Sequence, residues 1–208
     1  MQNRYAASFR GFDYLNLDDQ LTDEQKLIRE SVRSWVNSAV VPIIEDCAEH
    51  HKFPKELIKQ LGEIGALGPH IPTQYGGGGL DYISYGLMMQ ELERGDSGLR
   101  STASVQSSLV MFPIYTYGSE EQKKKYLPKL ATAEWIGAWG LTEPNTGSDA
   151  MRMKCVAKED GDYWVLNGTK CWITHGITGN VAVVIARTGE LLDSHGMTAF
   201  IVERGTPG

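Results

Sequence analysis

The spacing of apolar residues changes near residue 133. Before it, apolar positions recur every three to four residues, as they do on one face of a helix. Thr22 with Gln25, and Ser119 with Gln122, match the capping-box pattern that begins a helix. After it, short β-branched and aromatic runs alternate with turn residues. The pattern predicts the α+β class, with an all-helical domain followed by a β-domain.

The strand pattern predicts an antiparallel sheet. We expect strands at residues 136–141, 151–157, 163–166, 169–173, 181–186 and 197–202. Asp160-Gly161 and Asn167-Gly168 lie between consecutive runs, and both are hairpin signals. Every connection is too short for a crossover helix, so we expect a meander around these turns. Since the sequence stops just after a strand and would leave a sheet edge unpaired, it indicates part of a larger protein.

These patterns divide the sequence into an N-terminal extension (1–14), a helical domain (15–133) and an incomplete β-domain (134–208). The 208 residues are 41% apolar and 22% charged, as in ordinary globular proteins. A net charge of −6 argues against nucleic-acid binding. No apolar run approaches the ~20 residues of a membrane span, and residues 1–12 lack the apolar core of a secretory signal. Neither the Cys nor the His residues have metal-site spacing, so we expect no metal.

Two segments of the β-domain carry candidate chemistry. Residues 139–150 form a polar turn, and residues 170–174 form an aromatic run. Brought together by a meander, they could hydrogen-bond the edge of a flat heterocycle and cover its face with the Trp172 indole. Trp172 could instead be an ordinary apolar strand residue. Glu143 could be a general base, although Pro144 places it in a turn, where a structural role is favoured.

Arg100 is the candidate for substrate specificity. A guanidinium can hold a carboxylate through two parallel hydrogen bonds. Ser104 lies one helical turn further on the same face, Ser101 could add a hydroxyl or backbone contact, and Glu93 could orient the arginine. Arg100 could also be a surface residue in an ion pair. The small, apolar and hydroxyl residues at 103–110 favour a buried helix instead.

These runs resemble the acyl-CoA dehydrogenase family from about residue 12 to residue 208. The pattern Thr-Glu-Pro-x-x-Gly-Ser-Asp, which begins at Thr142, is typical of the family. The pattern Arg-Ser-x-x-Ser-Val-Gln-Ser-Ser, which begins at Arg100, is typical of its glutaryl branch. The run at residues 117–122 adds to the resemblance.

The resemblance implies a subunit of three parts, of which the C-terminal helical bundle is absent from this sequence. That bundle carries the catalytic glutamate, so we assign no catalytic residue here and expect the isolated chain to be inactive. The cofactor is expected to be FAD. The residues expected to contact it are Trp139, Leu141, Thr142, Ser148, Trp172, Ile173 and Thr174. Those expected to contact the acyl-CoA are Arg100, Ser101, Ser104 and Ser148.

The implied reaction is α,β-desaturation of glutaryl-CoA, with decarboxylation to crotonyl-CoA, as in lysine and tryptophan degradation. The resemblance also implies an electron-transfer flavoprotein as acceptor and a homotetramer. Such a protein would be cytoplasmic in a bacterium and in the mitochondrial matrix of a eukaryote. The alternatives are a short- or branched-chain acyl-CoA dehydrogenase, and a non-catalytic remnant that binds flavin or acyl-CoA.

Overall fold

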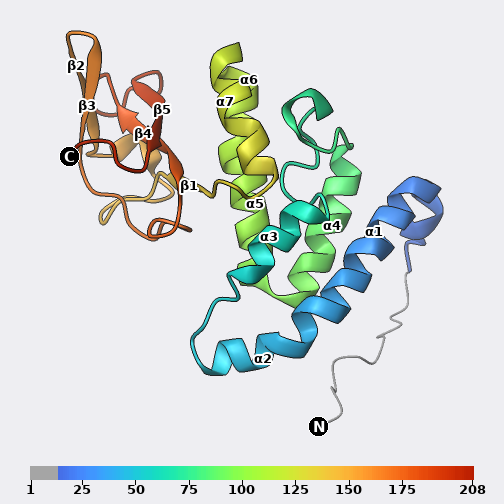
Figure 1. The fold of residues 1–208 in the computed structure, drawn as a ribbon. Coiled ribbons are helices and arrows are strands. Elements are labelled where there is room, and N and C mark those ends of the chain that lie inside the picture. The colour runs from blue at the N-terminus through green and yellow to red at the C-terminus, as the bar shows by residue number, and fades with distance from the viewer. Residues whose placement is uncertain (1–13) are drawn as a thin grey trace.

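The computed structural model describes residues 14–208, so the predicted N-terminal extension lies outside the described residues except for Tyr14. Figure 1 shows a helical part beside a β-part, joined through β1. The α-helices are α1 (Asp23–Trp35), α2 (Val41–Glu49), α3 (Glu56–Glu63), α4 (Tyr82–Gly95), α5 (Ser97–Ser104), α6 (Phe112–Tyr117) and α7 (Glu120–Ala131). The strands are β1 (Gly137–Gly140), β2 (Val156–Asp160), β3 (Tyr163–Asn167), β4 (Val181–Arg187) and β5 (Met197–Glu203).

Both predicted capping boxes are confirmed at the starts of α1 and α7. The Thr22 hydroxyl accepts from the Gln25 amide at 3.2 Å, and the Gln25 side chain accepts from the Thr22 amide at 3.0 Å. Ser119 and Gln122 make the same reciprocal pair. Two π-helical segments, Val36–Val40 and Val105–Met111, join α1 to α2 and α5 to α6. The chain from Ser97 to Tyr117 is therefore one long helical rod with a wide turn in its middle.

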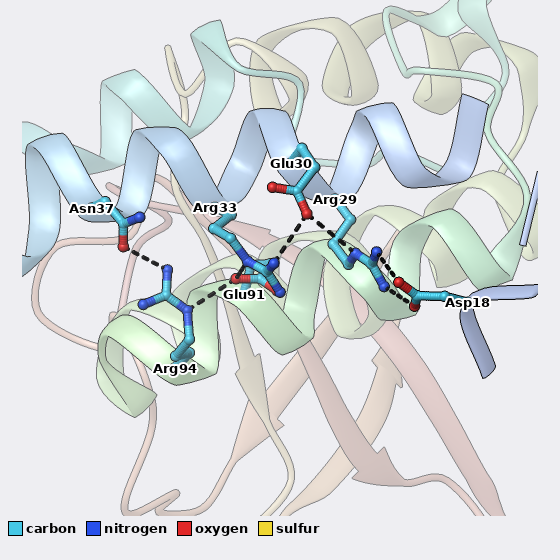
Figure 2. Close-up of polar contacts among 7 residues, drawn as sticks. All are labelled: Asp18, Arg29, Glu30, Arg33, Asn37, Glu91 and Arg94. Atoms are coloured by element: carbon cyan, nitrogen blue, oxygen red, sulfur yellow. Dashed lines mark hydrogen bonds and ion pairs between the residues drawn. The ribbon is translucent and has the colours of Figure 1, made fainter. Parts of the chain in front are cut away.

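A buried carboxylate ties α4 to α1 (Figure 2). The Glu91 side chain is only 2% exposed, and it accepts hydrogen bonds from Arg33 at 2.7 and 3.1 Å and from Arg94 at 3.0 Å. Burial alone would raise the pKa of Glu91, but the two guanidinium groups together outweigh it and lower that pKa. Glu91 is therefore a charged structural link inside the helical part.

The sheet is mixed, which differs from the expected antiparallel arrangement. β2 with β3 and β4 with β5 are antiparallel, but β4 pairs with β1 in parallel over four residues and meets β2 in parallel at one pair. A parallel pair needs a long connection, and the β2–β3 hairpin within residues 141–180 provides it without an α-helix. The Asp160-Gly161 turn is confirmed, since Asp160 pairs with Tyr163 across it.

The predicted strand at residues 169–173 is wrong. Gly168 passes so close to Cys155 that a Cβ there would lie 2.6 Å from the Cys155 Cα. The following residues pair with the turn after β1, because the Cys171 amide donates to the Thr142 carbonyl at 2.9 Å. A long-range contact thus replaces the local hairpin expected at Asn167-Gly168.

The helical part and the sheet share a core. Val181 and Val183 of β4 pack in one cluster with Met111, Leu127 and other residues of the helical part. Buried Gln106 adds a polar link, since its carbonyl accepts from the Gly137 amide of β1 and its amide donates to the Leu130 and Trp135 carbonyls. This junction fixes the β-domain segments relative to α5. Within residues 14–208, no helix has the length and apolar character needed to cross a membrane.

Candidate functional site

The two predicted β-domain segments lie together. Besides the Cys171–Thr142 contact, the Lys170 ammonium donates to the Leu141 carbonyl at 2.9 Å. The expected pairing of the polar turn with the aromatic segment is therefore found, although the second segment is a loop and not a strand.

Glu143 holds this pairing in place. One of its oxygens accepts from the Cys155 amide at 2.9 Å and from the Lys170 ammonium at 2.8 Å, and the other accepts from the Lys154 amide at 2.6 Å. Burial would raise the pKa of Glu143, but the bond from Lys170 and the two amide bonds outweigh it, so the pKa is lowered. A buried, ionised carboxylate with both oxygens occupied is suited to structure and not to proton abstraction.

Trp172 presents its indole to solvent. The residue is 92% exposed, and its backbone lies in the left-handed region with φ of 60°. That conformation is costly for a bulky residue and persists only where the surroundings hold it. The alternative of an ordinary apolar strand residue does not describe Trp172, which is neither in a strand nor buried.

A cavity of about 450 Å³ lies between the helical part and the loop after Trp172. Ile173 and Thr174 line it from the loop, and Ser101 lines it from α5. An adjoining recess of about 570 Å³ has Trp172 and Ile173 on its wall and reaches over β4. Ser101 and Thr174, which are 73 positions apart in the sequence, therefore face one space.

Arg100 and Ser104 occupy a neighbouring face of α5. The Arg100 Nε donates to Glu93 at 2.5 Å, and its Nη1 donates to the Ser104 hydroxyl at 3.2 Å. The arginine side chain keeps about a third of its surface exposed. Glu93 orients Arg100, as the sequence predicted. The Ser104 hydroxyl donates its own proton to the Ser101 carbonyl at 3.1 Å, so Ser104 positions the arginine and holds no spare donor.

Trp139 and Ser148 lie apart from the cavity. Trp139 pairs with Val183 in the sheet, and its half-buried side chain packs on the core shared with the helices. Ser148 is exposed on the turn after Glu143 and lines neither hollow.

His175 borders both hollows, and no sequence pattern indicated it as a site residue. Its Nδ1 lies 3.1 Å from the Thr178 hydroxyl, its Nε2 is buried with no partner among the described residues, and its backbone φ is 61°. Burial lowers the pKa of His175, so the ring is neutral at neutral pH. No metal-type spacing or alternating pattern pointed to this residue.

The chemistry of these groups fits a flat heterocycle. Across the described part of the chain, the hydroxyls and backbone amides of Thr142 and Thr174 and the Ser148 hydroxyl have no protein partner. These donors lie on the two joined segments, next to an exposed indole. Such a site can hydrogen-bond the edge of a ring system and cover one of its faces.

Sequence profiles of the acyl-CoA dehydrogenase N-terminal domain and middle domain match residues 22–134 and 138–208. The chain belongs to the acyl-CoA dehydrogenase family. FAD is the cofactor of this family, as the resemblance implied. The predicted order of a helical part followed by a β-part is likewise confirmed.

Among relatives in the family, the glutaryl-CoA dehydrogenase of Mycobacterium smegmatis, solved in complex with FADH2, is 45% identical with a TM-score of 0.87, over 93% of this chain and 49% of that one. Glutaryl-CoA dehydrogenase of Desulfococcus multivorans is 38% identical, over 92% of this chain and 50% of its own. Mitochondrial isovaleryl-CoA dehydrogenase of Pongo abelii is 39% identical, over 97% and 49%. The chain thus spans about half the length of these relatives.

Proposed function

We propose that the full-length protein is an FAD-dependent dehydrogenase of glutaryl-CoA that goes on to release carbon dioxide and give crotonyl-CoA. Bound FAD would take up the hydride from Cβ of the acyl chain, and the protein would bind and orient both reactants. In this proposal, residues 15–133 form the helical domain and residues 134–208 form part of the β-domain.

The proposal rests on the unused hydrogen-bond donors of Arg100. A guanidinium has five N–H groups. One is used by Glu93 and one by Ser104, so the other three have no acceptor among the described residues. The two protein bonds hold the arginine toward α4, directly after Leu99 and before Ser101, whose side chain lines the cavity. A carboxylate at the end of an acyl chain would match these free donors, and a neutral acyl end would not.

The proposed flavin contacts are Trp139, Leu141, Thr142, Ser148, Trp172, Ile173 and Thr174. Their support comes from the free hydroxyl and amide donors of Thr142 and Thr174 and from the exposed Trp172 indole. Ser148 could also reach the acyl-CoA. Removal of the α-proton needs a base, and Glu143 is unsuited because both of its oxygens are occupied. We therefore propose that the base lies outside this chain and that the isolated chain is inactive.

A short- or branched-chain acyl-CoA dehydrogenase is the second candidate. The isovaleryl-CoA relative, at 39% identity, is as similar as the glutaryl-CoA relative from Desulfococcus multivorans at 38%. In that case Arg100 would be a structural residue, and its loss would affect every substrate alike. A non-catalytic remnant would oxidise none of them.

The electron-transfer flavoprotein, the homotetramer and the compartment implied by the resemblance remain parts of the proposal.

The test replaces Arg100 by Ala in the full-length, flavin-loaded protein and compares glutaryl-CoA with butyryl-CoA. A carboxylate left without its partner costs on the order of 2–5 kcal/mol. That corresponds to about one and a half to nearly four decades in kcat/KM for glutaryl-CoA. Butyryl-CoA, which has no carboxylate, should keep its kcat/KM. Arg94→Ala is the matched control, because Arg94 is similarly exposed but pairs with Glu91 and not with Glu93. Equal losses on both substrates would refute the glutaryl assignment.

A further inference from the structure

A nearly buried ion pair joins the two β-domain segments of the site. The Lys170 ammonium lies 2.8 Å from a Glu143 oxygen, and the two side chains are only 11% and 4% exposed. Lys170 comes two residues before Trp172, and Glu143 lies on the turn after β1. Charges so far out of water are screened much less than surface charges. They therefore act on any group that binds next to them.

The two charges are not placed alike with respect to the recess of about 570 Å³. Lys170 lines this recess together with Trp172, whereas Glu143 lines neither hollow. The Glu143 oxygens face the chain that leads into β2, where they accept from the Lys154 and Cys155 amides. Because the interaction between charges falls with distance, a group bound in the recess interacts more strongly with the cation than with the anion.

Lys170 also polarises a peptide group of the site. Its ammonium donates to the Leu141 carbonyl at 2.9 Å, and this carbonyl shares a peptide group with the unpaired Thr142 amide. The bond lengths of a peptide place the ammonium within about 5 Å of the Thr142 nitrogen. Hydrogen bonds that follow one another polarise each other, so the cation makes the Thr142 amide a stronger donor. The third N–H of the ammonium has no acceptor within residues 14–208.

Two other charged side chains line the recess, and both are more exposed. Glu203 is paired with the Lys125 ammonium at 2.6 Å. Arg204 is exposed and donates to two carbonyls of the loop after Trp172. Among the charged groups on this wall that the structure describes, Lys170 is therefore the least exposed to water, and it lies next to the segments with the free donors.

We propose that Lys170 supplies a fixed positive charge beside the bound flavin and raises its reduction potential, while Glu143 holds the ammonium and weakens its effect. The inference rests on the proposed flavin contacts of the two segments. Reduction adds electrons to the ring system, so a nearby cation and a polarised donor stabilise the reduced form more than the oxidised form. Lys170 thereby tunes the cofactor and takes no part in proton transfer.

The test compares Lys170→Met and Glu143→Gln in the full-length, flavin-loaded protein. Met removes the ammonium, and Gln removes the negative charge while it keeps the shape of Glu. We expect Lys170→Met to lower the two-electron reduction potential and Glu143→Gln to raise it. A tenfold change in the reduction equilibrium, which is about 30 mV, is the expected size of each shift. The potential is read from the visible spectrum of the flavin at equilibrium with a redox dye.

Two further variants separate charge from position. Lys158→Met is the matched control, because Lys158 is exposed on β2 and lines neither hollow, so its loss should leave the potential unchanged. Lys170→Arg keeps the positive charge and should stay closer to the wild-type potential than Lys170→Met does. The dissociation constant of oxidised FAD is measured separately on each apoprotein by flavin fluorescence.

Shifts of the same sign in Lys170→Met and Glu143→Gln, or no shift in either, would overturn the inference. A pair that only braces the two segments would weaken the binding of oxidised and reduced FAD alike, and the potential would not change in opposite directions. If Lys170→Met does not retain FAD, the Glu143→Gln shift decides, since only a rise supports the inference. A wild-type full-length protein that binds no FAD would instead overturn the proposed function itself.

Discussion

Replacing Gln106 by Met should weaken the junction between the helical part and the sheet. Gln106 is 2% exposed, and Met has a similar length without polar atoms. The wild-type side chain accepts from the Gly137 amide at 2.7 Å and donates to the Leu130 and Trp135 carbonyls at 2.8 and 2.9 Å. The substitution removes all three bonds while it keeps the packing nearly unchanged.

The free-energy cost of losing the bond to Gln106 differs among its three partners. The Ile136 carbonyl faces β4, so the next residue, Gly137, points its amide away from β4 toward Gln106. This amide would be left buried and unpaired, at a cost of about 1–3 kcal/mol. The partly buried Trp135 carbonyl loses a bond worth about 0.5–1.5 kcal/mol. The Leu130 carbonyl keeps the Ala133 amide at 3.3 Å, so it adds little. Together these give about 1.5–4.5 kcal/mol.

The measurement is urea unfolding of the 208-residue chain, followed by tryptophan fluorescence. Trp135 and Trp139 lie at the junction and report on it directly. Gln90→Met is the matched control, because Gln90 is exposed on α4 and should change stability by less than about 0.5 kcal/mol. A Gln106→Met variant within about 1 kcal/mol of wild type would refute the argument, since water or a shifted backbone would then be satisfying Gly137.

Two further predictions concern the stability of this chain. The folded-state pKa of Glu143 is lowered, so its stabilising effect is present above its unfolded pKa and is lost as the pH falls through the folded value. Urea midpoints of wild type should therefore drop as the pH falls below the ordinary glutamate pKa of about 4.3, and Glu143→Gln, less stable at neutral pH, should show a smaller drop; parallel pH profiles would contradict this. Gly86→Ala should raise stability by about 0.5–1 kcal/mol, because a Cβ at this position inside α4 meets open space. A destabilised Gly86→Ala in the same urea assay would mean that the backbone there is needed for another contact.

Elements determined by local signals could be predicted from the sequence. The capping boxes at Thr22 and Ser119 need only four consecutive residues, and the Asp160-Gly161 turn needs only its two neighbouring strands. The ion pair between Glu93 and Arg100 is also close in sequence. In each case the partners lie within a few residues, so the pattern contains the whole interaction.

Contacts between segments that are far apart in the sequence could not be predicted from these local signals. The pattern at residues 169–173 suits a strand, but Cys171 pairs with Thr142 and the chain leaves the hairpin. The parallel pairing of β1 with β4 depends on where that long connection returns. For Ser104, the spacing predicted the correct face of the helix. It could not predict that the Ser104 hydroxyl donates its proton to the backbone carbonyl of Ser101, one turn away.

The backbone around Trp172 supports a ligand on this face of the protein. A left-handed conformation costs a non-glycine residue about 1–2 kcal/mol, and here Trp172 and His175 both adopt it. An indole that is 92% exposed gains almost no burial energy in return. The bonds that hold the loop lie on either side of it, from Cys171 to Thr142 and from Gly179 to His175, so they fix the backbone and leave the ring uncovered. Folding alone gives no reason to hold an uncovered indole in a strained position. A flat cofactor stacked on the indole would supply that reason, because the backbone that presents the ring is already fixed and does not have to be ordered on binding.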